Sequence, residues 1–223
     1  MDFVIPASRI TKGGIEVYPK FIVKKSEDLM IRGGDFYAIW LEEENRWSTD
    51  EQDVIDKVDN MLRKYAAEKQ TTNIAYMWDA DSHSIDKWHQ YCSKQMRDQW
   101  KLLDSKLVFQ NEEVKKEDYV TRRLPYVVQE GDISSYQELA STLYSSEELL
   151  KIEWMVGSIL TGDSKNLQKF YVFYGAPGTG KSTMLNIIQE LFPGYASAFD
   201  AKSLGDRNNT FSLEQFKHNP LIA

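Results

Sequence analysis

Residues Lys169–Gly194 read "KFYVFYGAPGTGKSTMLNIIQELFPG", and this stretch decides which fold to expect. Phe170–Tyr174 is an uncharged run of β-formers, which predicts a strand covered on both faces within a parallel sheet. Apolar residues then recur at helical spacing from Met184 to Phe192, until Pro193 and Gly194 end the run. The stretch therefore predicts a strand, a glycine-rich turn and a helix in direct succession.

The turn between strand and helix, Gly175–Ser182, fits the pattern G-x-x-x-x-G-K-[ST]. Glycines permit a turn that aims several N–H groups inward, and the following helix adds its positive end, so the pattern favours a polyphosphate ligand. We expect ATP and Mg²⁺ as cofactors, with Lys181 reaching the β- and γ-phosphates as the catalytic residue and Ser182 as the metal ligand. The predicted nucleotide-binding residues are Gly175, Ala176, Pro177, Gly178, Thr179, Gly180, Lys181, Ser182 and Thr183.

Two helices are expected before the loop, within residues 134–162. Ser135 with Glu138, and Ser145 with Glu148, each have the spacing of a capping box. The second helix is expected to end at Gly162 in a left-handed stop. Its predicted apolar face consists of Leu149, Ile152, Val156 and Ile159. Upstream, Tyr119–Val128 predicts a short extended piece.

The N-terminal half predicts a small β unit followed by helices. Ile15–Lys25 and Asp35–Trp40 are rich in β-branched and aromatic residues, and glycine pairs at 13–14 and 33–34 mark turns before them. A helix is expected over Asp50–Lys69, where Thr49 and Gln52 have the capping-box spacing. A second helix is expected from Ser84 to Leu103.

Composition limits the setting of the chain. The net charge of -7 argues against the whole surface being a phosphate-binding face, and residues 24–60 hold eleven acidic against five basic side chains. The single cysteine, Cys92, allows no internal disulfide, and no secretory signal precedes the first strand-like segment. No apolar run approaches the ~18 residues of a membrane span. We expect a cytoplasmic protein without membrane partners.

Two weak metal-site patterns have ordinary alternatives. Asp79 and Asp81 hint at a metal site, but a capping loop before the next helix is the better interpretation. His83, His89 and Cys92 could be imagined as zinc ligands, yet their spacing fits no structural-zinc pattern, so surface or half-buried helix residues are expected. His218 is expected in a loop.

Two further groups could contact nucleic acid. Four aromatic residues, Phe36, Tyr37, Trp40 and Trp47, could stack on bases, but alternating aromatics in a hairpin are more often its core. Four cations, Lys115, Lys116, Arg122 and Arg123, could contact a nucleic-acid backbone, but such a group is more often a solvated face.

Residues 120–223 resemble the superfamily-three helicases of the phage and poxvirus primase-helicase type. The resemblance is carried by a helical segment with Trp154 and Gly157, by the Gly175–Thr183 loop, and by an F-x-L-x-x-[LF] pattern. The apolar marks of that last pattern are Phe211, Leu213 and Phe216. Thr179 stands where the family more usually has Asn, and residues 1–119 match the family only in outline.

The resemblance implies an α/β P-loop NTPase core of AAA-like type, incomplete here, preceded by a small β unit and a mainly helical helicase-associated region. The implied domains are residues 1–132, with β-hairpins over about 1–48 and helices over 49–132, and residues 133–223 as the start of the NTPase domain. The expected acidic Mg²⁺-binding strand end and arginine finger would lie beyond Ala223. We therefore expect an N-terminal fragment of a longer protein.

The function that the resemblance implies is that of an ATP-dependent DNA helicase in phage or viral replication, acting in the host cell cytoplasm. Members work as homo-oligomeric rings, usually hexamers, and DNA would be contacted mainly through regions beyond residue 223. A primase or other replication proteins are further candidate partners. This fragment alone is expected to bind ATP and hydrolyse it poorly. Two alternatives are a kinase-like P-loop enzyme and a non-enzymatic docking module gated by nucleotide.

Overall fold

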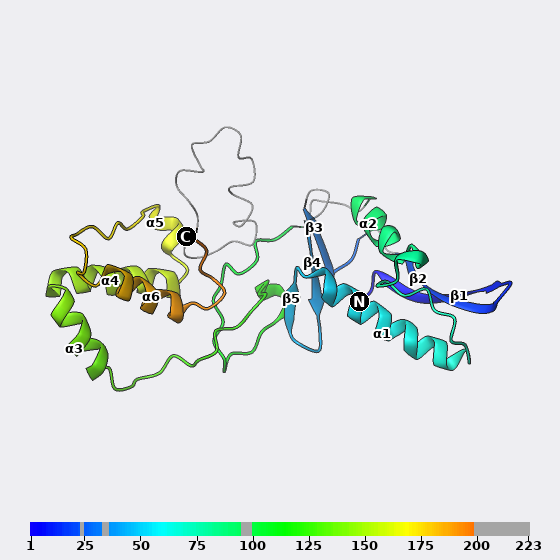
Figure 1. Cartoon of the computed structure of the whole chain (residues 1–223), viewed down its shortest axis with the longest axis horizontal. Helices are drawn as coiled ribbons and strands as arrows, with labels where there is room; N and C mark the ends of the chain where they lie inside the picture. Colours follow the sequence, from blue (N-terminus) through cyan, green and yellow to red (C-terminus); the bar gives the residue numbers. More distant parts are fainter. Residues whose placement is uncertain (23–24, 33–35, 95–99, 199–223) are drawn as a thin grey trace. The chain divides into compact units, whose positions relative to one another are not determined.

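The computed structural model describes residues 1–22, 25–32, 36–94 and 100–198 (Figure 1). The chain forms two compact units. The first unit comprises Met1–Lys101 and Val114–Thr121. The second comprises Leu102–Glu113 and the chain from Arg122 onward. The chain therefore changes from one unit to the other after residues 101, 113 and 121. The start of the NTPase domain at residue 133 stays a prediction.

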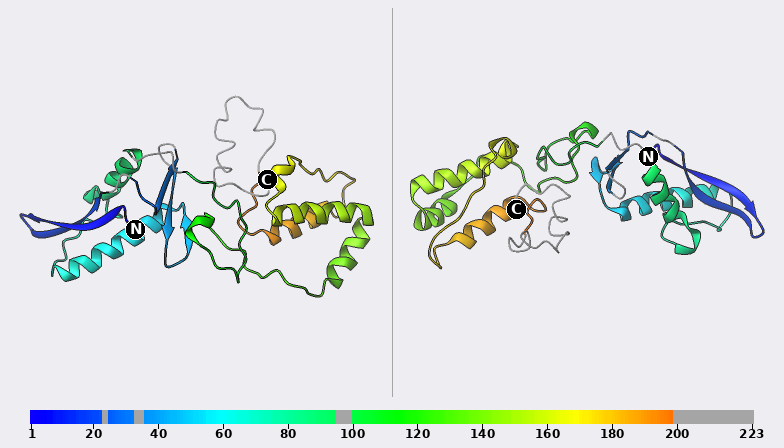
Figure 2. Two further views of the ribbon diagram at one scale, coloured as in Figure 1. Left: turned by 180° about the vertical axis from the view of Figure 1, so that it is seen from behind. Right: turned by 90° about the horizontal axis from the view of Figure 1, so that it is seen from above.

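The first unit contains two antiparallel sheets. Strands β1 (Val4–Thr11) and β2 (Gly14–Phe21) form a long ribbon, seen in Figures 1 and 2, whose turn places Gly14 at a left-handed φ of 104°. Strands β3 (Leu29–Arg32), β4 (Phe36–Leu41) and β5 (Arg46–Ser48) pair in that order. The predicted β-hairpins are confirmed.

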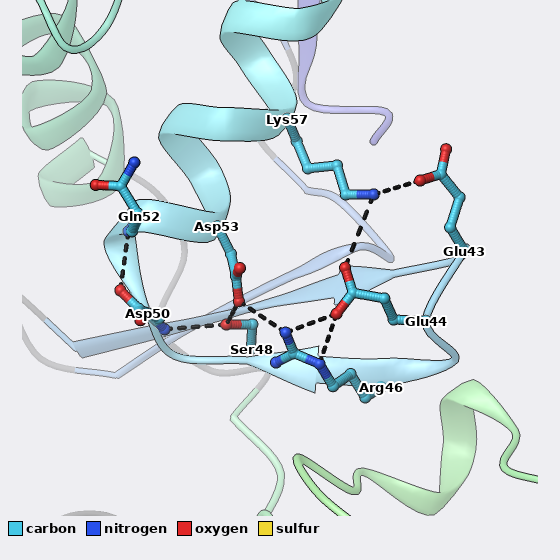
Figure 3. Close-up of polar contacts among 8 residues, drawn as sticks. All are labelled: Glu43, Glu44, Arg46, Ser48, Asp50, Gln52, Asp53 and Lys57. Atoms are coloured by element: carbon cyan, nitrogen blue, oxygen red, sulfur yellow. Dashed lines mark hydrogen bonds and ion pairs between the residues drawn. The ribbon is translucent and has the colours of Figure 1, made fainter.

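Helix α1 (Glu51–Glu68) confirms the helix expected over Asp50–Lys69. Its predicted cap was wrong by one residue, because Asp50 is the N-cap and its side chain accepts from the N–H of Gln52 at 2.9 Å. Figure 3 shows why the chain enters the helix there: the hydroxyl of Ser48 accepts from the Asp50 N–H at 3.1 Å and donates to Asp53 at 2.5 Å. The strand end therefore positions the helix start.

The short 3₁₀ turn η1 (Ala80–Ser82) leads into helix α2 (Ser84–Lys94). The prediction of a helix reaching Leu103 is wrong at its C-terminal end, since residues 100–103 are not helical. From Leu102 the chain belongs to the second unit, and Asp104 adopts a left-handed φ of 51°.

The core of the first unit packs α1 and α2 against the strands. Aromatic rings dominate it: Trp88 lies 5.1 Å from Tyr37 in an edge arrangement and 5.7 Å from Phe3, measured between ring centroids. Tyr37, Trp40 and Trp47 are all at most 9 % exposed. The interpretation of these aromatics as hairpin core is confirmed for those three, while the side chain of Phe36 lies outside the described residues. The 3₁₀ turn η2 (Lys116–Asp118) closes this core, because the indole N–H of Trp47 donates to the Lys116 carbonyl at 2.8 Å.

The regular secondary structure described in the second unit consists of four α-helices. They are α3 (Ser134–Leu143), α4 (Ser146–Leu160), α5 (Ser164–Leu167) and α6 (Lys181–Leu191). Their buried residues include Ile152 and Ile159 of α4 and Met184 and Ile188 of α6, joined by Phe192 and Tyr195. Leu149 and Val156 are partly buried against this cluster, so the expected apolar face of α4 is confirmed.

The helix ends test the predicted caps. The Ser145–Glu148 capping box is present, and Gly162 follows α4 at a left-handed φ of 77° as predicted. The predicted box at Ser135 is wrong, because α3 begins at Ser134 and Ser135 lies inside it. A carboxylate oxygen of Asp132 accepts from the Ser134 N–H at 2.9 Å instead.

The expected strand Phe170–Tyr174 is not paired with any described segment. Its residues alternate: Phe170, Val172 and Tyr174 are 87 %, 71 % and 97 % exposed, whereas Phe173 packs against the helical cluster. The prediction of a strand covered on both faces is therefore wrong for the described structure, which covers one face only. A lone strand is not stable without neighbouring backbone. The extended piece around Tyr119–Val128 likewise makes a single bridge, between Phe109 and Leu124.

Candidate nucleotide-binding site

The loop before α6 needs glycine at two positions. Gly178 and Gly180 have φ values of 81° and 76°, in the left-handed region that side chains other than glycine rarely adopt. A Cβ atom at Gly180 would also lie 2.7 Å from the side chain of Leu143, whereas one at Gly178 would meet open space. The loop therefore depends on glycine for its backbone shape and, at Gly180, for close packing under α3.

The loop and the first turn of α6 present unused backbone donors. No acceptor of the described chain lies in hydrogen-bond geometry with the N–H groups of Gly178, Gly180, Lys181, Ser182 and Thr183. The first intrahelical bond runs from Met184 N–H to the Gly180 carbonyl at 3.0 Å. Such donors, together with the positive end of the helix, form an anion-binding site.

The side chain of Lys181 lies over the loop. Its ammonium donates to the carbonyl oxygens of Gly175 at 2.9 Å and Ala176 at 2.6 Å, and to the hydroxyl of Thr179 at 3.2 Å. Thr179 itself donates to the Ala176 carbonyl at 2.9 Å. The amine is thus already placed beside the unused N–H groups, where a phosphate oxygen would meet both.

A pocket of about 730 Å³ covers the loop. Its lining comprises Gly175, all of Pro177–Thr183 and two leucines of α3, Leu139 and Leu143. The leucines stand one helical turn apart and form an apolar wall beside the polar loop. Sequence analysis did not find them, because nothing in their local pattern distinguishes them from other core positions of a helix.

The helix α4 supports the segment that leads into the loop. Trp154, one of the residues that carry the family resemblance, lies 6.3 Å from Tyr171 between ring centroids. Gly157, the other, has open space at its Cβ position. Packing therefore accounts for Trp154, and nothing in the described structure explains a glycine at 157.

The described residues fit Mg²⁺ only in part. Ser182 is exposed at the start of α6, as a ligand would need to be, but no carboxylate lines the pocket. No group of three or more His, Cys, Asp or Glu residues that could hold a metal occurs in the part of the chain that the structure describes. Ser182 with phosphate oxygens would hold the ion, and its role stays a prediction.

The weaker metal candidates have structural roles. Asp79 caps η1 by accepting from the Asp81 N–H at 3.1 Å, so the capping interpretation is confirmed. His83 and His89 are surface residues that contact Asp86 at 3.0 Å and Glu51 at 2.7 Å respectively. Cys92 is buried, and burial followed by the charge of Glu51 raises the pKa of its thiol to about 12. The thiolate is the nucleophilic form of cysteine, so a thiol that stays neutral is a poor nucleophile.

Two of the four cations proposed for a nucleic-acid backbone have partners within their own unit. Lys116 pairs with Asp28. Burial alone would raise the pKa of Asp28, but the hydrogen bond and charge of Lys116 and the N-terminal amine lower it. Arg122 donates to the Gly194 carbonyl, and its guanidinium carbon lies 5.1 Å from the centroid of the Tyr195 ring. These two cations stabilise the fold.

A second pocket, of about 680 Å³, lies along α1, and several of its acidic residues form ion pairs. Figure 3 shows Lys57 between Glu43 and Glu44, and Arg46 between Glu44 and Asp53. Lys57 approaches Glu43 to 2.6 Å, and Arg46 approaches Asp53 to 3.0 Å. These ion pairs occupy Glu43, Glu44 and Asp53 of the lining, and the lining as a whole keeps an excess of acidic residues.

Comparisons with protein-family models, with curated proteins and with solved structures found no significant match for this chain. The resemblance to superfamily-three helicases therefore remains a prediction carried by the residues quoted for it. Phe211, Leu213, Phe216 and His218 lie outside the described residues. Within the described ranges, no helix combines the length and the apolar character that crossing a bilayer requires.

Proposed function

We propose that this chain binds Mg²⁺–ATP at the Gly175–Thr183 loop and belongs to an ATP-dependent DNA helicase of the phage or viral replicative type. The observation that carries the nucleotide site is the set of unused N–H groups at the start of α6 beside the ammonium of Lys181. The helicase class rests on the sequence resemblance alone, as do the α/β AAA-like fold and the hexameric ring, whereas the cytoplasmic location is also expected from the composition of the chain.

Each residue of the loop has a distinct task in this proposal. Gly178 and Gly180 permit the backbone to turn, so that the N–H groups surround the phosphates. Lys181 exchanges its carbonyl partners for β- and γ-phosphate oxygens, which are stronger acceptors because they are charged. Ser182 contributes a hydroxyl to the metal ion, and the metal neutralises negative charge on the phosphates.

The leucine wall suggests how the remainder of the nucleotide is held. Leu139 and Leu143 line the same pocket as the loop, and Leu139 is 39 % exposed. An apolar surface next to a phosphate site suits the flat face of a base or the carbon side of a ribose. We therefore place the nucleoside against α3.

Hydrolysis requires groups that the described pocket does not contain. An acid that holds Mg²⁺ and orients water, and an arginine that neutralises developing charge, are the usual parts of such a site. Neither residue type lines this pocket among the described residues. We expect the chain of residues 1–223 to bind ATP and to turn it over slowly.

Calorimetric titration of the chain with Mg²⁺–ATP tests the nucleotide site. We expect saturable binding that Lys181→Ala weakens about 10- to 100-fold, because one or more charge-assisted hydrogen bonds are lost. Lys169→Ala, which removes an exposed lysine of the same unit outside the loop, should leave the affinity unchanged. Absence of binding, or equal binding by Lys181→Ala, would contradict the proposal.

The helicase part needs a separate experiment on the complete gene product. Strand separation of a forked DNA duplex should depend on ATP and should be abolished by Lys181→Ala. ATP turnover that is indifferent to single-stranded DNA, with phosphate transferred to a small acceptor, would favour the kinase alternative. Nucleotide binding with no turnover at all would favour the docking module.

A further inference from the structure

A groove of about 410 Å³ in the first unit differs in charge from the rest of this acidic protein. It lies where β2 packs against α2. Four cations line it, namely Arg9, Lys20, Lys87 and Lys94, and no carboxylate belongs to the lining described. The pocket along α1, in contrast, is lined by five acidic residues against three basic ones.

The charge of the groove follows from where the fold places these residues. Lys87, Tyr91 and Lys94 are spaced by four and three residues on α2, so they share one face of the helix. Strand β2 supplies Lys20 and strand β1 supplies Arg9. These four are all the lysines and arginines that β1, β2 and α2 contain, so the three elements direct their whole positive charge into one groove.

The acidic residues of the same elements are already engaged. Glu16 forms an ion pair with Arg9, and Asp86 contacts the ring of His83 at 3.0 Å. Lys20, Lys87 and Lys94 are exposed and form no ion pair with any residue in the described ranges. Unpaired lysines in a groove without acids attract an anionic ligand, even in a protein of net negative charge.

Aromatic rings line the groove between the cations. Tyr18 is half-buried, and the guanidinium carbon of Arg9 lies 5.2 Å from its ring centroid. Phe21 and Tyr91 are also half-buried, with their ring centroids 5.2 Å apart. Packing on Trp88, 6.1 Å away, fixes the ring of Tyr91. The groove thus presents Phe21 and Tyr91, which pack against the core, and Tyr18, which packs on Arg9, next to exposed lysines.

We propose that this groove binds single-stranded nucleic acid, with Lys20, Lys87 and Lys94 contacting phosphates and Tyr18 stacking on a base. Alternating cations and fixed aromatic rings are the two elements of single-strand recognition, because phosphates bind the former and unpaired bases stack on the latter. The inference deepens the proposed function by naming where one strand is held. It does not depend on nucleotide, since the groove lies in the first unit.

Fluorescence anisotropy of a labelled oligothymidine, with the chain of residues 1–223 and no ATP, tests the proposal. Lys87→Gln/Lys94→Gln should weaken binding about 10-fold or more, because two phosphate contacts are lost. The control Lys64→Gln/Lys69→Gln makes the same charge change at two exposed positions, one in α1 and one just after its C-terminus, and should alter affinity less than twofold. Tyr18→Leu keeps an apolar side chain and should weaken binding about fivefold by removing the stacking surface.

Two further arms identify the ligand. A duplex of equal length should bind more weakly than the single strand, because its bases are not free to stack. Oligouridine distinguishes RNA from DNA as the source, and tighter binding of either strand identifies the natural ligand. Any of three results would overturn the proposal. The two double variants could lose the same amount of oligothymidine affinity, the duplex could bind as tightly as the single strand, or Tyr18→Leu could leave the affinity unchanged. Failure here with intact Mg²⁺–ATP binding would leave the nucleotide site standing.

Discussion

The Gly175–Thr183 loop and the basic groove are both proposed to bind anions, but they are built differently. The loop uses neutral backbone N–H groups and one lysine from nine consecutive residues, Gly175–Thr183. The groove uses side-chain charges from β1, β2 and α2, elements that span residues 4–94. Backbone donors act at a fixed spacing in sequence, whereas side-chain cations act together only after folding. The two sites should therefore respond differently to loss of the core, to salt and to changes at glycine.

Disruption of the core of the first unit should produce the largest difference between the two sites. Trp88 is fully buried beneath the groove and contacts Phe3, Phe21, Tyr37 and Tyr91. Trp88→Ala should cost about 3–5 kcal/mol of folding free energy in the first unit, because it leaves a large cavity. Chemical denaturation followed by tyrosine and tryptophan fluorescence measures this loss.

Trp88→Ala also tests whether the two sites are independent of each other. Single-strand binding should fall with the stability of the first unit, while Mg²⁺–ATP binding should stay within twofold of the native value. Phe192→Ala, which leaves a cavity in the core of the second unit, is the matched control. It should weaken Mg²⁺–ATP binding and leave single-strand binding unchanged. Parallel loss of both activities in both variants would show that the units do not act independently.

Salt should affect the two sites to different extents. Three unpaired lysines in the groove predict a slope of about -2 in the logarithm of single-strand affinity against the logarithm of salt concentration. Raising salt from roughly 50 to 200 mM should therefore weaken binding about 15-fold. Mg²⁺–ATP binding should fall less, because most of its donors are backbone N–H groups. A slope near zero for the single strand would show that the lysines do not contact phosphates.

The glycines of the loop give the smallest and most local effect. Gly178→Ala places a side chain at a left-handed φ, which costs about 1–2 kcal/mol and should weaken Mg²⁺–ATP binding about fivefold. Gly180→Ala should weaken it further, because its Cβ would also meet Leu143 at 2.7 Å. In the background of Leu143→Ala, which itself removes part of the nucleoside wall, Gly180→Ala should weaken binding no more than Gly178→Ala does. Calorimetry of the four variants measures these differences.

Local signals were sufficient for much of the secondary structure. The interactions that set a capping box, a helix stop and a helix join residues at most four positions apart. The structure confirms the Ser145–Glu148 box, the Gly162 stop and the helix expected over Asp50–Lys69. The box at Ser135 failed because α3 already begins at Ser134, and Asp132, which precedes that start, accepts from the Ser134 N–H. Capping patterns compete, and the sequence alone does not rank neighbouring candidates.

Signals that depend on distant partners were less informative. The Phe170–Tyr174 run predicts a fully covered strand, yet coverage depends on backbone contributed by other segments, and the described structure covers one face. Lys116 and Arg122 were grouped as a possible nucleic-acid contact, but Asp28 and Gly194 engage them from positions far away in sequence. The basic groove was not predicted at all, because Arg9, Lys20 and Lys87 are isolated cations in the sequence.

The amino-acid sequence by itself determined where a candidate phosphate loop lies, since glycine, lysine and serine at fixed spacing predict backbone donors before a helix. Only the tertiary structure decided that Leu139 and Leu143 wall the loop, and that four dispersed cations share a groove with Tyr18. The physical reason is the range of the interactions. Backbone geometry is set by adjacent residues, whereas charge density and apolar packing are sums over whatever the fold brings together.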